Sequence, residues 1–273
     1  MGSLVHISHA DLHATIELFS RWGVKPAHFE RLRAEPDSIF AQRVRHAFLS
    51  EDIPGAISWQ MAHQLMGNEH FFGPDDWTTL YGARFTKKQL RQIVRFPWNE
   101  AVLNSLCPFV PGKTIRETHL AFLELDRING DPLTIMKWQQ LQPAPGQPRF
   151  DKYASEAWYS GHKFAVKTTG QLRWRLMPLE IVPNSENQTF ADQQGMLPAN
   201  YEVPLAMTEV TKAFLYFKKS GKYVNPNRYG RCLDLTSDGL RVGVGIFDAI
   251  GLVVDGYWDG RRVNVGLAAA RKF

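Results

Sequence analysis

From residue 229 to the end of the chain, short strand-forming segments alternate with glycine turns, and this pattern constrains the fold most. The segments read as short strands over 231–235, 241–247, 252–257 and 265–271. The breaks between them read Ser-Asp-Gly, Asp-Ala-Ile-Gly and Trp-Asp-Gly. Because turns this short join antiparallel neighbours, we predict several antiparallel strands at this end.

Upstream of these strands, the pattern predicts one strand and two helices. Residues 164–177 alternate in the manner of a strand or hairpin, and 190–197 form a short helix that Thr189 caps. A longer helix is expected over 203–219, where Ala206, Val210 and Phe214 share one face and Gly221 ends the helix. The predicted order is therefore strand, two helices, then strands.

The first half is predicted to be mainly helical. Apolar residues recur at helical spacing over 8–22, from Pro26 onward, over 39–48 and over 57–66, and further helices are expected over 86–94, 99–106, 114–125 and 132–141. The proline-rich run 142–148 is the expected domain boundary. We thus predict an α+β protein in which a helical domain, 1–148, with an adaptor or assembly role precedes a domain at 149–273.

Composition favours a soluble globular protein. The 273 residues are 44% hydrophobic and 22% charged, and no apolar run is long enough for a membrane span. No secretory signal is recognisable at the N-terminus, so a cytoplasmic location is expected. The net charge of +5 is distributed over both halves, which does not favour a nucleic-acid partner.

Catalytic and metal-binding patterns are scarce. All nine histidines lie at or before His162, so neither a Ser-His-Asp triad nor a histidine-metal centre fits within the strand-rich half. Gly112-Lys113-Thr114 lacks the preceding glycine of a phosphate-binding loop. Recurrent aspartates between 234 and 259 suit either turns or a calcium site, and the turns are favoured. We predict no catalytic residue, no metal and no cofactor.

Segment 239–264 breaks the local rules for a simple sheet. Ile250 occupies a tight turn, where a polar side chain is normal, and the adjacent Val253 and Val254 cannot both point inward. Such inconsistencies are expected at functional sites. A buried strand pair with one irregular turn is the structural alternative.

A resemblance to a known family fits these observations. The order strand, two helices, strands, with a final strand containing Asn264, Gly266, Leu267, Ala268 and Arg271, resembles the C-type-lectin-like fold. More specifically, it resembles the bacterial variable proteins of diversity-generating retroelements. The resemblance implies that adenine-directed mutagenesis recodes positions on the last strands. It does not imply calcium-dependent sugar binding, because 258–260 lacks the ligand pattern of calcium-binding lectins.

The resemblance implies a non-enzymatic protein that binds a protein or another macromolecule through the C-terminal sheet and loops. Its framework would include Arg241, Phe247, Trp258, Gly266, Leu267 and Arg271. Tyr257 and Ile250 are expected to be more than half exposed. The ligand-binding residues would be Leu240, Gly243, Ile246, Ala249, Ile250, Val253, Asp255, Gly256, Tyr257, Gly260, Arg261, Val263 and Asn264.

Two other functions stay open from the sequence. The helical half could belong to a nucleic-acid-binding regulator, with a basic cluster at Lys87, Lys88, Arg91 and Arg95. The chain could also be related to formylglycine-generating enzymes, which are similar to lectin-like folds. Their chemistry uses cysteine, and Cys232 is the only cysteine in the strand-rich half.

Overall fold

The computed structural model describes residues 17, 25–36, 38, 56–153 and 155–273, and the chain forms two compact units, Met1–Asp52 and Ile53–Phe273. In the first unit, helix α2 spans Pro26–Ala34 and begins at the proline, as expected. Apart from Glu17, the helices predicted over 8–22 and 39–48 lie outside the described residues.

The second unit begins with short helices and two-residue strands. Ser58 caps α4 (Trp59–Met66) by accepting a hydrogen bond from the Met61 amide, and Gly67 ends that helix at a φ of 76°. The predicted helices over 57–66, 86–94, 99–106 and 132–141 correspond to α4, α6 (Lys87–Ile93), α7 (Glu100–Asn104) and α9 (Ile135–Leu141). The elements are β1 (Ile57–Ser58), α4 (Trp59–Met66), β2 (Phe71–Phe72), α5 (Pro74–Tyr81), α6 (Lys87–Ile93), β3 (Arg95–Phe96), α7 (Glu100–Asn104), α8 (Ile115–Thr118), β5 (Arg127–Ile128), β6 (Asp131–Pro132) and α9 (Ile135–Leu141).

The helix predicted over 114–125 is wrong beyond its first turn. Helix α8 stops at Thr118, and β4 (His119–Glu124) follows with all six residues buried. A strand buried on both faces lacks the alternation that identifies strands in a sequence. Strand β4 runs parallel to β2 and antiparallel to β7 (Arg173–Pro178).

The second half contains the predicted strand, the two predicted helices and the further strands in that order, but a two-residue strand at Tyr201–Glu202 lies between the two helices. The segment before β7 is helical rather than extended, because η2 (Trp158–Gly161) and α10 (Lys163–Val166) occupy it. The other elements are α11 (Phe190–Gly195), β8 (Tyr201–Glu202), α12 (Ala206–Ser220), β9 (Tyr229–Leu235), β10 (Arg241–Gly245), β11 (Val253–Tyr257), β12 (Val265–Leu267) and β13 (Ala270–Arg271).

Four of these strands form a sheet in the order β11-β10-β9-β12. Strands β9, β10 and β11 are antiparallel, as predicted, but β12 runs parallel to β9. The chain must therefore cross from one edge of the sheet to the other between β11 and β12. That crossing is the segment 258–264.

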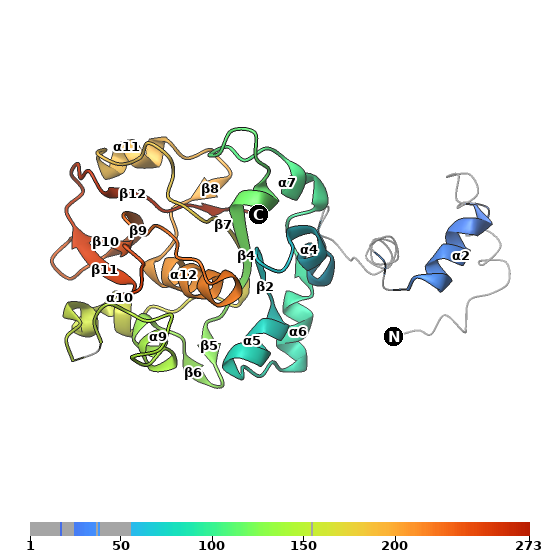
Figure 1. Ribbon diagram of the computed structural model, residues 1–273, viewed down its shortest axis with the longest axis horizontal. Coiled ribbons are helices and arrows are strands. Elements are labelled where there is room, and N and C mark those ends of the chain that lie inside the picture. The colour runs from blue at the N-terminus through green and yellow to red at the C-terminus, as the bar shows by residue number, and fades with distance from the viewer. Residues whose placement is uncertain (1–16, 18–24, 37, 39–55, 154) are drawn as a thin grey trace. The chain divides into compact units, whose positions relative to one another are not determined.

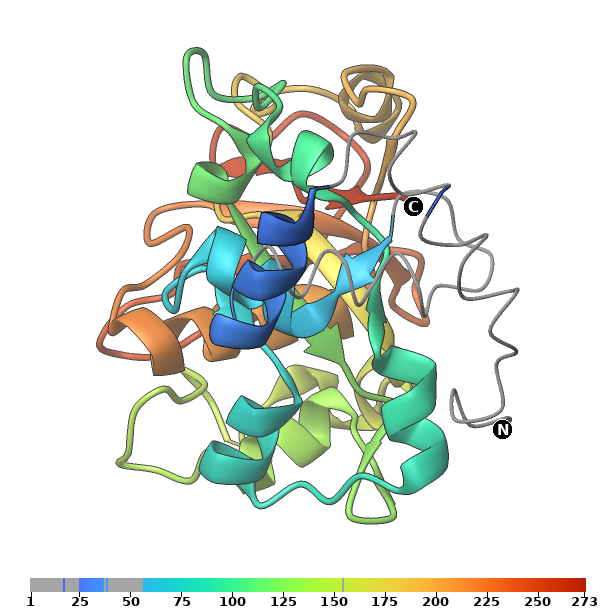
Figure 2. The ribbon, with the colours of Figure 1, turned by 90° about the vertical axis from the view of Figure 1, so that its right-hand side faces the viewer.

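Helix α12 is the central helix of the second unit and packs against both of its larger sheets. It contacts β4 on one side and β9 and β10 on the other, and its residues from 206 to 216 are buried (Figures 1 and 2). One hydrophobic cluster includes residues from both halves of the sequence, from Ile57 to Ala270. The fold is a mixed α+β structure.

The structure contradicts the domain boundary predicted at residue 148. Strands β4 and β7 lie on opposite sides of that position and pair along their whole length. The compact units instead divide between Asp52 and Ile53. The proline-rich run is a surface connection whose end joins the C-terminal sheet, since Phe150 forms a bridge with Leu252.

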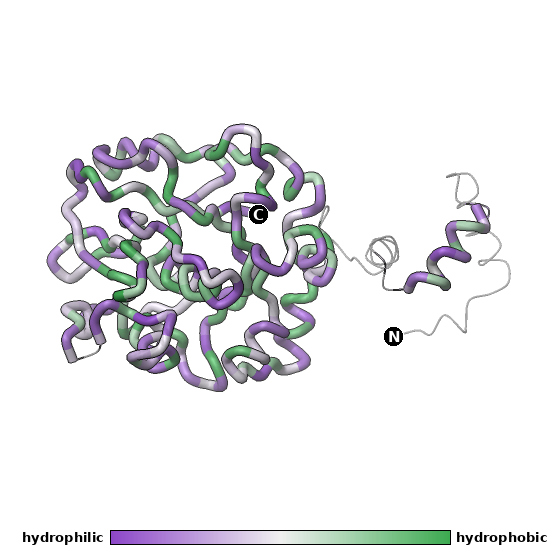
Figure 3. Tube along the Cα trace, in the orientation of Figure 1, coloured by the Kyte–Doolittle hydropathy of each residue, from purple (hydrophilic) through white to green (hydrophobic). Residues whose placement is uncertain are grey.

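Along the described residues, hydrophilic and hydrophobic positions are interspersed (Figure 3). Among the described residues, no helix has both the length and the hydrophobicity needed to cross a bilayer.

Candidate ligand-binding surface

One face of the β9–β10–β11 sheet is packed against the core, and the other carries the candidate site. Cys232, Val242, Val244 and Val254 lie in the core cluster beside α12. Because successive strand residues point to opposite faces, their neighbours project away from that core.

Two tyrosines meet across the middle strand on this opposite face. Gly243 of β10 lies opposite Asp255 of β11, and the rings of Tyr229 and Tyr257 are 5.2 Å apart. A side-chain carbon at Gly243 would lie 3.2 Å from the Tyr257 ring, so glycine provides the space for this contact. Burial raises the pKa of Tyr257, and Tyr229 and the nearby Asp255 carboxylate raise it further.

The crossing segment 258–264 has a backbone that the rest of the unit holds in place. The buried Arg231 side chain donates from Nη2 to the carbonyls of Trp258, at 3.2 Å, and Gly260, at 2.9 Å. The amide of Phe190 donates to Asp259, and the amide of Asn187 donates to the carbonyl of residue 262. The Tyr229 amide also donates to the carbonyl of Asn264, so groups outside the segment bind five of its backbone carbonyls.

The side chains of the same segment extend into solvent. Val263 is 81% exposed, Trp258 is 62% exposed, and Arg261 is also exposed. Asp259 is exposed too, but its carboxylate pairs with Arg241 at 3.2 Å, and Asn264 is partly buried. Most side chains here can change without removing a hydrogen bond that holds the loop.

The β10–β11 turn is built in the same way. Asp248 accepts hydrogen bonds from the amides of Ile250 and Gly251, which forms an Asx turn. Side chains at the end of the proline-rich run bind the turn's carbonyls: Gln147 donates to Ala249 at 2.7 Å, and Arg149 donates to Ile250 at 2.8 Å. The Ile250 side chain is 63% exposed. We define the display surface as the turn 249–250 together with the segment 258–263.

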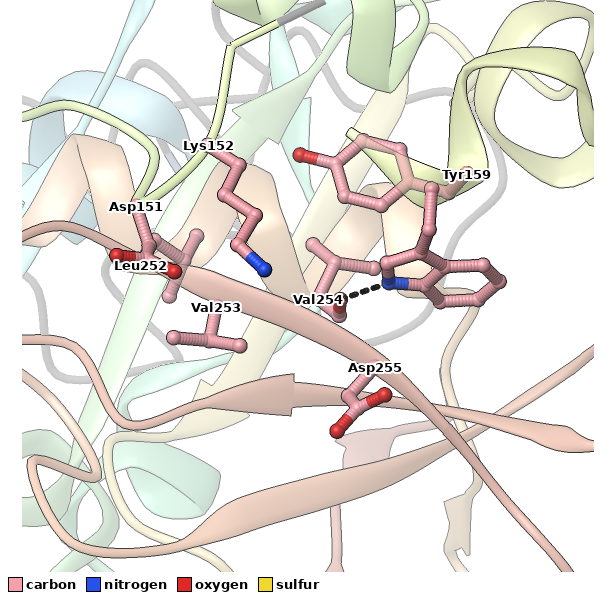
Figure 4. A pocket seen from close by; sticks show the side chains of 8 residues that line it. Asp151, Lys152, Tyr159, Leu252, Val253, Val254 and Asp255 are labelled. Atoms are coloured by element: carbon pink, nitrogen blue, oxygen red, sulfur yellow. Dashed lines mark hydrogen bonds between the residues drawn. The ribbon is translucent and has the colours of Figure 1, made fainter. Parts of the chain in front are cut away.

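A hollow of about 100 Å³ lies beside β11, the strand that follows the β10–β11 turn (Figure 4). Trp158 forms one wall, and its Nε1 donates to the Val254 carbonyl at 2.9 Å. The Lys152 side chain extends into the hollow, and Asp151 and Asp255 supply carboxylates. This arrangement offers an aromatic surface and both signs of charge to a small polar group.

The predicted site residues divide into three groups. Gly243 is buried beneath the tyrosine pair, which contradicts its predicted exposure. Tyr257 is partly buried, so the expectation that it is more than half exposed is wrong, whereas the same expectation for Ile250 is confirmed. The exposed residues are Ala249, Ile250, Gly260, Arg261 and Val263, and the partly buried ones are Leu240, Ile246, Val253, Asp255, Gly256, Tyr257 and Asn264.

The framework prediction was wrong for Trp258. Phe247, Gly266 and Leu267 are buried as expected, and Arg241 and Arg271 are partly buried. Trp258 is exposed because its backbone, and not its ring, is bound by Arg231. An interfacial indole of this kind suits ligand contact.

Sequence reasoning missed four residues near the site. Leu233 and Leu235 of β9 are exposed, and their alternation with buried Cys232 is a signal that could have identified them. Trp158 and Lys152 reach the hollow from a segment far from β11 in the sequence. No local pattern marks that juxtaposition.

The aspartates that could have gathered around calcium are dispersed in local hydrogen bonds. Asp234 accepts from the Ala206 amide, Asp248 caps its own turn, and Asp259 binds Arg241. Within the described ranges, no group of three or more metal-ligating side chains comes together. Both cysteines are buried and unpaired, and burial raises the pKa of the Cys232 thiol.

Comparison of the chain with protein-family models, curated proteins and solved structures finds no match. Function is therefore inferred from the residues and the geometry described above.

Proposed function

We propose that this chain is a non-enzymatic ligand-binding protein, which presents the display surface on a C-type-lectin-like scaffold to a protein or another macromolecule. The proposal includes the resemblance to variable proteins of diversity-generating retroelements, in which the side chains of such a surface change while the scaffold stays constant.

One observation carries the proposal: the backbone of the display surface is bound by framework groups, while its side chains are solvent-exposed. Arg231, Gln147 and Arg149 bind carbonyls, which every residue type possesses. A protein that diversifies its binding site needs this separation, because affinity comes from a few exposed anchors on a rigid support.

A strained backbone supports the same interpretation. Ile246, next to the β10–β11 turn, adopts a φ of 42°, a conformation that is costly for a β-branched residue. Asparagine or glycine would suit this position better for folding alone. An isoleucine here is consistent with a side chain that is selected for contact with a ligand.

A randomised library tests the proposal. Ile250, Trp258, Arg261 and Val263 are varied together to all residue types in the full chain, displayed on yeast and selected against a purified protein such as lysozyme. We expect most members to fold with thermal midpoints close to the parent's, and the selected binders to lose binding when these four positions become alanine.

A matched library at four buried positions, Val242, Val244, Val254 and Leu267, provides the control and should contain few folded members. The proposal is overturned if the two libraries fold equally poorly. It also fails if the exposed positions tolerate all changes but never yield a binder that depends on them.

A further inference from the structure

A second surface, on α6, carries positive charge that the proposed ligand-binding function does not use. The stretch 77–99 contains five Lys or Arg residues and neither Asp nor Glu. Helix α6 lies within it, at the edge of the second unit in both views (Figures 1 and 2). Lys87, Lys88 and Arg91 are all exposed.

These cations are not balanced by neighbouring acids. Among the described residues, none forms an ion pair with Lys87, Lys88 or Arg91. A second acid-free stretch, 157–179, differs in this respect, because its Arg173 and Arg175 pair with carboxylates of other segments. The exposed charge of α6 is therefore available to a partner.

Aliphatic side chains lie on the same side of α6 as the cations. Lys87, Leu90, Arg91 and Val94 have the spacing i, i+3, i+4, i+7, which places them along one face of the helix and its C-cap. Leu90 and Val94 are each 45% exposed, whereas Ile93, which lies beside Leu90 at the edge of this stripe, is buried. We define the α6 face as this stripe, Lys87, Leu90, Arg91 and Val94, together with Lys88, which flanks it beside Arg91.

The position of the lysines opposes helix stability. Lys87 and Lys88 occupy the first turn, where the helix dipole disfavours cations. Folding alone would favour acidic or neutral residues there. Two lysines at this end are more readily explained by an anionic partner.

We propose that the α6 face docks on the surface of an anionic lipid bilayer. The three cations complement negatively charged headgroups, and Leu90 and Val94 leave water by entering the boundary between headgroups and acyl chains. The phosphate backbone of a nucleic acid would satisfy the cations but would leave the two aliphatic side chains without a favourable contact. The aliphatic residues therefore favour the bilayer.

Vesicle co-sedimentation with the full chain tests this proposal. Vesicles of equal parts phosphatidylglycerol and phosphatidylcholine should bind the protein, and vesicles of phosphatidylcholine alone should not. Each cation near an anionic surface contributes about fivefold to binding, so the double variant Lys87→Gln/Arg91→Gln should bind about 30-fold more weakly. Salt at about 1 M, which shortens the screening length to about 3 Å, should reduce wild-type binding strongly.

Two further variants separate this surface from net charge. Lys163→Gln/Lys167→Gln makes the same change in charge at the same spacing on exposed residues around α10, and it should bind like the wild type. Leu90→Ser/Val94→Ser preserves every charge and should weaken binding by about tenfold. Thermal melts of the two α6 variants should match the wild type, because the altered side chains are exposed.

The proposal is overturned if the full chain does not bind anionic vesicles, or if the α10 control loses as much binding as the α6 variant. It is also overturned if the serine variant binds like the wild type. Binding of duplex DNA that depends on Lys87 and Arg91, without vesicle binding, would assign the surface to nucleic acid instead.

Discussion

Replacing Arg231 should release the crossing segment from the sheet while leaving the rest of the second unit folded. The guanidinium is fully buried and donates to Gln193 at 3.0 Å and to the carbonyls of Trp258 and Gly260. Methionine has a similar length and no donor. The Arg231→Met variant therefore removes the three hydrogen bonds and retains most of the packing.

The magnitude follows from two opposing contributions. Three hydrogen bonds from a charged donor contribute about 1.5–3 kcal/mol each, and burial of the guanidinium costs several kcal/mol. Burial also lowers the pKa of Arg231, and the charge of Asp259 opposes this only in part. The lowered pKa is consistent with a cost of desolvating the guanidinium. We expect a net loss of about 3 kcal/mol in the free energy of unfolding, or about 6–12 °C in Tm.

Hydrogen exchange measured by mass spectrometry locates the effect. Amides of 258–264 should exchange much faster in Arg231→Met, whereas those of α12 should still be the slowest in the second unit. Arg261→Met is the matched control, because it makes the same substitution at an exposed residue of the same segment. Unchanged exchange in 258–264 together with an unchanged Tm would refute the role given to Arg231.

Three further results are expected. In chemical denaturation, Gly243→Ala should lower the free energy of unfolding by about 1–2 kcal/mol because the new side-chain carbon would displace the Tyr257 ring. Gly260 has open space around it, so the free energy of unfolding of Gly260→Ala should lie within about 0.5 kcal/mol of the wild-type value. Ile246→Asn should raise the free energy of unfolding by about 0.5–1 kcal/mol, because asparagine adopts a positive φ at lower cost than isoleucine. A lower denaturation midpoint for this variant would contradict the proposed backbone strain. Burial lowers the pKa of His119 to about 3, with Arg271 and Lys212 acting in the same direction, so the unfolded chain gains the proton first as pH falls. The contribution of His119 to the free energy of unfolding is complete above about pH 6.5 and is lost below it at about 1.4 kcal/mol per pH unit. The free energy of unfolding of His119→Gln, measured by chemical denaturation between about pH 6 and 4, should therefore depend less steeply on pH than that of the wild type.

Elements with a local signal were predictable from the sequence. The apolar face and terminal Gly221 of α12 identify that helix, and the glycine turns identify β9, β10 and β11 as separate strands. Strand β4 was not predictable, because its residues are buried on both faces and its partners lie at Phe71 and Trp174. Sequence spacing contains no information on that pairing.

The candidate site was predictable only in part, for the same reason. Ile250 in a tight turn was a local anomaly, and its exposure followed from it. The burial of Gly243 depends on the register of β10 against β9, which shifts between Arg241 and Gly243. The contacts of Arg231 and Gln147 with carbonyls join residues that are far apart in sequence. The acceptors in these contacts are backbone carbonyls, which every residue type has, so the sequence does not identify them.

The central claim is that the display surface changes while its framework stays constant, and the DNA around the gene tests it most directly. Sequencing that locus should reveal a reverse transcriptase gene and a near-copy of the gene's 3′ end. The account predicts that the two copies differ mainly at adenines of the near-copy and that the differences fall in codons of exposed residues such as Ile250, Arg261 and Val263. The account is contradicted if no such copy exists, or if the differences fall equally often in the codons of Arg231 and Leu267.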